Sequence, residues 1–294
     1  MPRFGTVLTA MVTPFDTDGT FAPKQAAALA TWLVENGSQG LVVAGTTGES
    51  PTLSVEEHLA LVEAAVGAVE VPVLAGTGSN DTRHAIAMTE MATERGADGV
   101  LLVAPYYNKP SQAGLLDHFS QIAAATALPA MIYDIPGRTG RKISTEVLLE
   151  LAEIPNVVAL KDAAGDVAET ASLIARAPEG FEVYSGDDNL TLPLVAVGAV
   201  GVVSVASHWA GSEIGQMVRD AHEGDLQAAI DQNARLIPSY EFESSLTAPN
   251  PVPTKAMMRH LGFEVGACRP PMGPEPADLS DRAGEVIAGL RGAT

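Results

Sequence analysis

The sequence is poor in cysteine and in basic residues. Cys268 is the single cysteine among 294 residues, so no disulfide can form within the chain and no site with several thiolate ligands can be built. There are 17 lysine and arginine residues against 36 acidic residues, which gives a formal net charge of −19. Such a surface repels phosphate backbones and anionic lipid, so neither nucleic acid nor a membrane is expected as a partner.

Long apolar runs are also missing. No segment of about 20 consecutive apolar residues is present, so no membrane span is expected. No apolar core with a cleavage site follows Met1 to Gly5, so no signal peptide is expected. With the single cysteine, these features predict a soluble, cytoplasmic protein. The six histidines show no metal-ligand spacing, so neither a metal nor another cofactor is expected.

What the chain does contain is a regular alternation of short apolar segments and helical patterns. The candidate strands are residues 7–12, 40–44, 71–75, 99–103, 129–133, 157–160, 182–184 and 201–205. Most are rich in Val, Leu and Ile, as strands buried on both faces are. Stretches such as residues 55–66 and 82–95 have the apolar spacing of amphipathic helices. Eight strand-helix units predict the α/β class and a closed (β/α)8 TIM barrel.

An open doubly wound sheet is the alternative fold. That fold usually carries a Gly-rich phosphate turn after its first strand, but Thr13-Pro14-Phe15-Asp16 follows here. After about Ala210 only helical patterns remain, at residues 213–222, 226–243, 253–261 and 279–290. We therefore expect a catalytic barrel over residues 1–224 and a C-terminal helical domain over residues 225–294.

Polar residues gather where the candidate strands end, which is where active sites lie in such barrels. These segments are residues 45–50, 105–108, 133–140, 161–162 and 185–188. Lys161 is the sharpest signal, because it is the only one of five lysines that directly continues a strand. Burial there would lower its pKa and make it a nucleophile. A lysine paired with Asp162 at the barrel rim is an equally good interpretation.

The other candidates also have two interpretations each. Tyr133 can pass protons beside Lys161, or it is a half-buried strand tyrosine. The loop of residues 45–50 suits a small carboxylate, or it is a turn before a helix that Ser54 and Glu57 cap. Arg138, in a Gly-flanked loop, can bind a second carboxylate or lie free at the surface. For Asp187 and Asp188 we favour solvated turn residues over a cation site.

These motifs together resemble the dihydrodipicolinate synthase family, within the pyruvate-dependent class I aldolases and lyases. The resemblance spans nearly the whole chain and rests on Gly45-Thr46-Thr47-Gly48-Glu49-Ser50, Pro105-Tyr106-Tyr107-Asn108-Lys109-Pro110, Tyr133-Asp134-Ile135-Pro136-Gly137-Arg138-Thr139-Gly140, Lys161, Ser185-Gly186-Asp187-Asp188 and Asn250-Pro251-Val252-Pro253-Thr254-Lys255. It implies a Schiff-base lyase of diaminopimelate and lysine biosynthesis that condenses pyruvate with L-aspartate-4-semialdehyde. It also implies a homotetramer, built as a dimer of dimers.

The resemblance assigns a role to each matching residue. Lys161 corresponds to the Schiff-base lysine and Tyr133 to the proton donor and acceptor. Thr46 and Tyr107 correspond to the rest of the proton relay, with Tyr107 reaching in from a neighbouring subunit. Substrate contacts are implied for four residues, namely Thr47 and Val203 for pyruvate, Arg138 for the carboxylate of the aldehyde, and Gly186 for a backbone contact in the same pocket.

Two departures from the family pattern stand out. Asp134 replaces an asparagine that many members have. In lysine-inhibited members an effector site lies nearby, and the equivalent places here are held by Ser50, Pro51, His58, Asn80, His84 and Tyr106. His84 stands where an acidic residue would bind the effector's amine, and Val55 replaces a histidine. Because an imidazole cannot replace a carboxylate, we expect weak or absent lysine inhibition.

Two other functions are compatible with parts of the pattern. A related aldolase acting on N-acetylneuraminate or a 2-keto-3-deoxy sugar acid would share Lys161, Tyr133 and the loop of residues 45–50, but would not need Arg138. A non-catalytic barrel that binds a metabolite would need no covalent chemistry at Lys161.

Overall fold

Eight parallel strands close into a barrel in the order of the chain. The computed structural model describes residues 2–292, and β1 pairs with both β2 and β8, so no strand edge remains open. The strands are β1 (Val7–Ala10), β2 (Gly40–Val43), β3 (Val73–Gly76), β4 (Gly99–Val103), β5 (Ala130–Asp134), β6 (Val157–Asp162), β7 (Glu182–Ser185) and β8 (Gly201–Ser204). The predicted TIM barrel is confirmed, and the open sheet is excluded.

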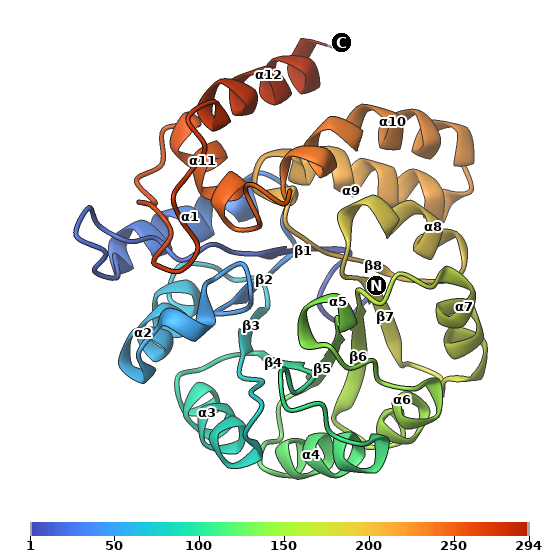
Figure 1. The fold of residues 1–294 in the computed structure, drawn as a ribbon. Coiled ribbons are helices and arrows are strands. Elements are labelled where there is room, and N and C mark those ends of the chain that lie inside the picture. The colour runs from blue at the N-terminus through green and yellow to red at the C-terminus, as the bar shows by residue number, and fades with distance from the viewer. Residues whose placement is uncertain (1, 293–294) are drawn as a thin grey trace.

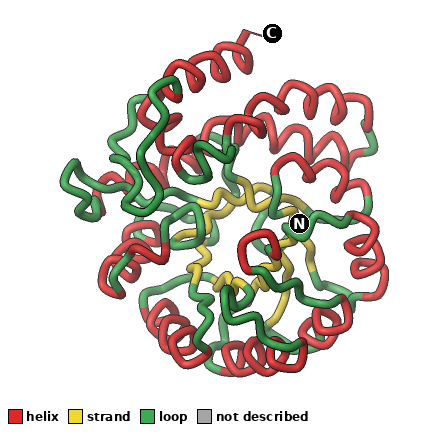
Figure 2. Tube along the Cα trace, viewed as in Figure 1, coloured by secondary structure: helices red, strands yellow, loops and turns green. Residues whose placement is uncertain are grey.

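The helices surround the ring of strands (Figure 2). Those of the barrel are α1 (Pro23–Glu35), α2 (Val55–Val66), α3 (Thr82–Glu94), α4 (Gln112–Ala124), α5 (Pro136–Thr139), α6 (Thr145–Ala152), α7 (Val167–Arg176), α8 (Thr191–Ala196) and α9 (Ser207–Glu223), with two short 3₁₀ helices, η1 (Ser50–Thr52) and η2 (Asp188–Leu190). The predicted capping box at the start of α2 is present, with Ser54 and Glu57 bonding each other's backbone N–H. Arg138 lies in the one-turn helix α5 and not in a loop.

Side-chain alternation along the strands decides what points into the barrel. Met131 and Ala159 belong to the apolar cluster that fills the barrel, with Leu8, Val42, Leu74, Leu101 and Val203. Ile132 and Leu160 belong instead to a cluster that also contains residues of the surrounding helices. Because residues two apart share a face of a strand, Tyr133 and Lys161 also point into the barrel.

The C-terminal segment consists of α10 (Leu226–Phe242), α11 (Val252–His260) and α12 (Leu279–Gly292). Figure 1 shows α10 beside α9, and α11 and α12 on the side of the barrel near α1. Their apolar residues share one buried cluster with Val7 of β1 and Val202 of β8. These helices therefore pack onto the barrel through a common core, and the division at residue 224 stays a prediction. Across residues 2–292, no helix combines the length and apolarity needed to cross a bilayer.

A candidate active site at the carboxyl end of the barrel

Lys161 and Tyr133 are direct neighbours on adjacent strands. The register of β5 and β6 pairs their Cα atoms, and Lys161 Nζ lies 4.2 Å from the centroid of the Tyr133 ring. Lys161 is 5% exposed and Tyr133 is 4% exposed. The structure thus brings the two central residues of the predicted site together inside the barrel.

The surroundings of Lys161 favour its neutral form. Burial lowers the pKa of its amine from 10.5 to about 8, against the charges of Asp187 and Asp188, which act to raise it. The positive charge of Arg138 adds to the lowering. A primary amine in this range is partly deprotonated near neutral pH, so it can attack a carbonyl carbon.

The interpretation of Lys161 as the partner of Asp162 is wrong. The Asp162 carboxylate accepts hydrogen bonds from the backbone N–H of Ala164, at 2.8 Å, and from the Thr170 hydroxyl on α7. Asp162 follows Lys161 directly, so its side chain points out of the barrel toward the helices.

The Tyr133 phenol stays protonated at rest. Burial raises its pKa above the ordinary value of 10.0, while the charge of Arg138 and the nearby Thr46 hydroxyl act to lower it. Thr46 is half-buried and lines the same cavity as Tyr133. The predicted trio of amine, phenol and hydroxyl is therefore contiguous within one chain.

Asp187 and Asp188 are not plain solvated turn residues. Asp188 is 3% exposed, and its carboxylate accepts hydrogen bonds from the backbone N–H groups of Val205, at 2.7 Å, and Ala206, at 3.1 Å. Burial raises the pKa of Asp187, while the charge of Lys161 acts to lower it. The local pattern did not reveal this, because the backbone groups that hold Asp188 lie 17 and 18 residues further along the chain.

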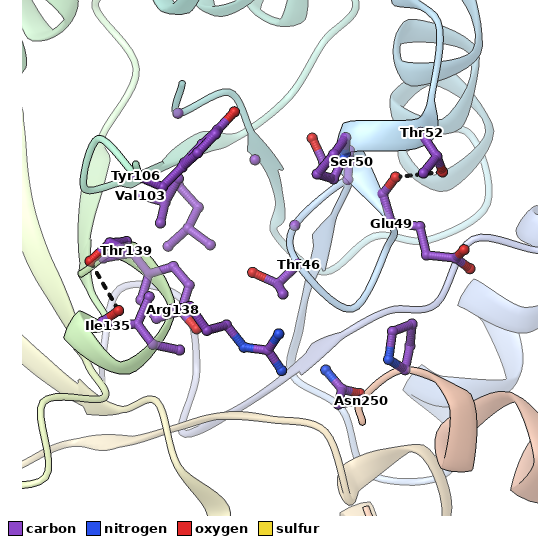
Figure 3. Close-up of a pocket in the computed structure, with 18 of the residues that line it drawn as sticks. Thr46, Glu49, Ser50, Thr52, Val103, Tyr106, Ile135, Arg138, Thr139 and Asn250 are labelled. Carbon is purple, nitrogen blue, oxygen red and sulfur yellow. Dashed lines mark hydrogen bonds between the residues drawn. The ribbon is translucent and has the colours of Figure 1, made fainter. Parts of the chain in front are cut away.

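A cavity of about 330 Å³ opens beside Tyr133 and Thr46. Its lining includes two charged residues, Glu49 and Arg138. Lys255 pairs with Glu49 at 2.7 Å, whereas none of the ion pairs between described residues includes Arg138. Figure 3 shows the Arg138 side chain extending from α5 into the cavity toward Asn250 and Thr46. A small anionic ligand would therefore meet one uncompensated cation at the mouth.

The loop of residues 45–50 is held from the C-terminal segment. Glu49 has a positive φ of 55° and is 3% exposed, and its carboxylate also accepts the backbone N–H of Arg269 at 2.8 Å. The Thr47 hydroxyl accepts a hydrogen bond from the Asn250 side chain at 2.9 Å. Glu49, Asn250 and Lys255 lie in the motifs that carry the family resemblance, but neither they nor Arg269 received a role from the sequence.

The remaining predicted substrate residues are placed differently from one another. Val203 is fully buried in the barrel interior, in the same apolar cluster as Tyr133. The backbone N–H of Gly186 donates to the carbonyl of Asp162 at 2.6 Å, which leaves its carbonyl for any ligand contact. Tyr107 is not brought to the site within one chain, since it is 89% exposed and has a positive φ of 72°.

The residues of the predicted effector site also come together. A second cavity of about 260 Å³ shares Ser50, Pro51 and Tyr106 with the first and adds His58 and His84. Asn80 lies beside it and donates to the carbonyl of Tyr106 at 3.2 Å. Burial, together with the charge of His84, lowers the pKa of His58 to about 4. No carboxylate is among the described residues that line this cavity.

The fold and the site together define a class of protein. A (β/α)8 barrel with a buried amine of lowered pKa, a neighbouring phenol and a cation at the mouth is built to capture the carbonyl group of a small anionic substrate covalently. Within residues 2–292, no group of three or more His, Cys, Asp or Glu residues is arranged to hold a metal ion. The class is that of the Schiff-base-forming lyases.

Comparison with known proteins gives the family. The chain belongs to the dihydrodipicolinate synthetase family, whose model matches residues 3–288. A 4-hydroxy-tetrahydrodipicolinate synthase from Bacillus subtilis is 49% identical over 94% of this chain and 96% of its own. The dihydrodipicolinate synthase of Bacillus anthracis shares 45% identity, covers 98% of both chains and superimposes with a TM-score of 0.94. A chloride-inhibited synthase from Acinetobacter baumannii, solved with pyruvate, is 36% identical over 98% of this chain and 99% of its own, with a TM-score of 0.93.

These matches confirm the family, the class of enzyme and the activity that the motifs predicted. They give no support to a sugar-acid aldolase or to a non-catalytic barrel. The roles of individual residues remain predictions.

Proposed function

We propose that Lys161 forms a Schiff base with pyruvate and that the resulting enamine condenses with L-aspartate-4-semialdehyde. The observation that carries this proposal is the Lys161 amine, 5% exposed, with its pKa lowered to about 8, and lying 4.2 Å from the centroid of the Tyr133 ring. The relatives' name, 4-hydroxy-tetrahydrodipicolinate synthase, supports the choice of substrates. The Acinetobacter neighbour solved with pyruvate supports the first of them.

The reaction begins when the neutral Lys161 amine attacks the ketone carbon of pyruvate. Tyr133, with Thr46 beside it, delivers the proton with which the former ketone oxygen leaves as water. The iminium withdraws electrons from the neighbouring methyl group, which loses a proton and becomes an enamine carbon. Tyr133 is deprotonated once it has given its proton to the leaving water, so it can accept the methyl proton directly.

The enamine carbon then attacks the aldehyde carbon of the second substrate and forms the new carbon–carbon bond. The amino group of that substrate adds to the imine carbon, and the ring closes as Lys161 is released. Two carboxylates have to be held while this happens. We assign the pyruvate carboxylate to Thr47 with the loop of residues 45–50, and the second carboxylate to Arg138 at the cavity mouth.

We assign the pocket contact of Gly186 to its carbonyl and the apolar wall beside pyruvate to Val203. Because both substrates are anions and the chain has a formal charge of −19, attraction has to be local, since charges beyond about 10 Å are screened. Arg138 supplies that attraction. A cytoplasmic location and a homotetramer, with Tyr107 completing a neighbouring subunit's site, are part of this proposal.

Borohydride trapping tests the proposal. The protein is incubated with pyruvate, reduced, and digested for mass spectrometry. We expect one pyruvate adduct on Lys161, none in Lys161→Ala, and an unchanged adduct in Lys24→Ala, which alters an exposed lysine of α1. Absence of any adduct in the parent protein would refute the mechanism. An Arg138→Ala variant that retains full turnover with the semialdehyde would refute the assignment of the second carboxylate.

A further inference from the structure

A chain of buried hydrogen bonds runs from α11 to the loop of residues 45–50. The Thr254 hydroxyl on α11 donates to Asn250 Oδ1 at 3.1 Å, and Asn250 Nδ2 donates to Thr47 Oγ1 at 2.9 Å. The three residues are 0%, 7% and 3% exposed, in that order. Water therefore has little access to this chain, and the three side chains have to satisfy one another.

The donor-to-acceptor direction of these hydrogen bonds follows from which groups carry a proton. The Asn250 side chain presents an oxygen that only accepts and a nitrogen that only donates. Since Thr254 donates to the oxygen, the nitrogen is turned toward Thr47. The Thr47 oxygen is thereby an acceptor in this bond, so its own hydroxyl proton has to point elsewhere. Among residues 2–292, no side chain or backbone group accepts a hydrogen bond from Thr47 Oγ1.

The Thr47 end of this series of hydrogen bonds lies at the candidate active site. Thr46, which precedes Thr47, lines the cavity, and Asn250 lines it as well. In Figure 3 the Arg138 guanidinium points toward Asn250 from the opposite side of the cavity. A substrate carboxylate has no protons to donate, so it binds only groups that present one. A threonine whose proton faced Asn250 would instead present its lone pairs to the carboxylate.

We propose that Asn250, oriented by Thr254, is a positioning residue that makes Thr47 a hydrogen-bond donor to the pyruvate carboxylate. This inference rests on the proposed function, because it concerns how that substrate is held. The α11 region thereby fixes the polarity of a group at the active site without contacting the reacting carbon. Substrate recognition then depends on two segments 203 positions apart in the sequence.

Asn250→Asp tests the direction of the hydrogen bond between Asn250 and Thr47, because the two side chains, amide and carboxylate, have almost the same shape. An aspartate at this position can only accept, so Thr47 has to turn its proton toward it. We compare the concentration dependence of borohydride trapping for pyruvate and for methyl pyruvate, which has the same ketone but no carboxylate. We expect pyruvate affinity to fall about ten- to a hundred-fold, the range for a hydrogen bond to a charged group, and methyl pyruvate affinity to change less than about three-fold.

Two further variants separate orientation from charge. Thr254→Val alters no charge and removes only the donor that orients the Asn250 amide, so we expect a loss of about three- to ten-fold for pyruvate alone. Asn233→Asp places the same new charge on α10, outside the cavity lining, and we expect neither ketone to be affected.

The outcomes distinguish this inference from the proposed function. If the parent protein traps neither ketone, the Schiff-base mechanism itself fails. If the parent traps both but Asn250→Asp and Thr254→Val weaken the two ketones equally, Asn250 only supports the fold and the inference is overturned. Unchanged pyruvate affinity in Thr254→Val, with its unfolding midpoint measured in parallel, would also overturn it.

Discussion

At the scale of single residues, we expect the pKa of Lys161 to set the pH range of the reaction. Because burial lowers it to about 8, the amine is protonated and unreactive at lower pH. We expect the apparent rate constant of borohydride trapping with pyruvate to rise about tenfold per pH unit below pH 8 and to level off above it.

The charge of Asp187 raises the pKa of Lys161, so Asp187→Asn should move this rise to lower pH. Asp231→Asn removes an exposed carboxylate of α10 and should leave the profile in place. A profile that does not move in Asp187→Asn would contradict the electrostatic account of the amine.

Asp134 gives a second pH dependence, this time of stability. Burial raises its pKa from 3.8 to about 6, so the folded protein holds a proton that the unfolded chain releases. The stabilising effect of this proton is complete below about pH 4 and is lost as pH rises through 6.

In the parent protein the backbone N–H of Ile143 donates to Asp134 Oδ1 at 3.2 Å. Asp134→Asn keeps an oxygen that can accept this bond but cannot ionise, so the variant should not lose stability as pH rises. We expect the variant to be more stable than the parent at pH 7 by up to roughly 3 kcal/mol, from about two pKa units at 1.36 kcal/mol each. Urea unfolding at several pH values measures this, and a constant difference between pH 4 and pH 7 would contradict it.

We expect His84 to prevent tight binding of L-lysine in the second cavity. The described residues that line this cavity include no carboxylate to pair with an ammonium group. We expect no inhibition of the parent by sub-millimolar L-lysine, and at least a tenfold gain in sensitivity in His84→Glu, which supplies the missing charge. His222→Glu, an exposed change on α9, is the control. Inhibition of the parent at sub-millimolar L-lysine would refute the prediction.

At the scale of elements, a buried ion pair joins α11 to the loop after β2. Lys255 and Glu49 approach to 2.7 Å, and Lys255 is fully buried with its Nζ 4.0 Å from the Phe15 ring centroid. Removing one partner leaves the other charge buried alone, so Lys255→Met should lower the free energy of unfolding by about 3–5 kcal/mol.

The double variant Glu49→Gln with Lys255→Met should recover much of that loss, because no unpaired charge remains. Urea unfolding of the parent, both single variants and the double variant gives the coupling energy of the pair. Additive losses would show that the pair does not stabilise the contact between α11 and the loop.

At the scale of the whole molecule, Tyr107 is expected to act in a neighbouring subunit. Co-expression of Lys161→Ala with Tyr107→Phe tests this, because a mixed dimer would contain one site with both native residues. If half of the dimers are mixed and each has one of two sites intact, activity should recover to about a quarter of the parent value. Activity in the mixture no higher than in the separate variants would place Tyr107 in its own chain's site or outside catalysis.

Local patterns in the sequence predict the barrel and the centre of the site. Strand and helix patterns are local, so the eight strand segments, the capping box at Ser54 and the position of Lys161 at a strand end could be predicted from neighbouring residues. That Tyr133 and Lys161 point into the barrel became clear only once Met131 and Ala159, two residues earlier on the same strands, were seen in the barrel's apolar cluster. The family motifs added substrate roles for Arg138 and for Thr47 in the loop of residues 45–50.

The folded structure selects between the alternatives that local patterns leave open. It showed that Asp162 faces the helices and leaves Lys161 unpaired, and that Asp188 is buried. It also brought Asn250 to Thr47 and Lys255 to Glu49. Desolvation and hydrogen-bond direction depend on groups from distant segments, so no periodic pattern in the sequence contains them.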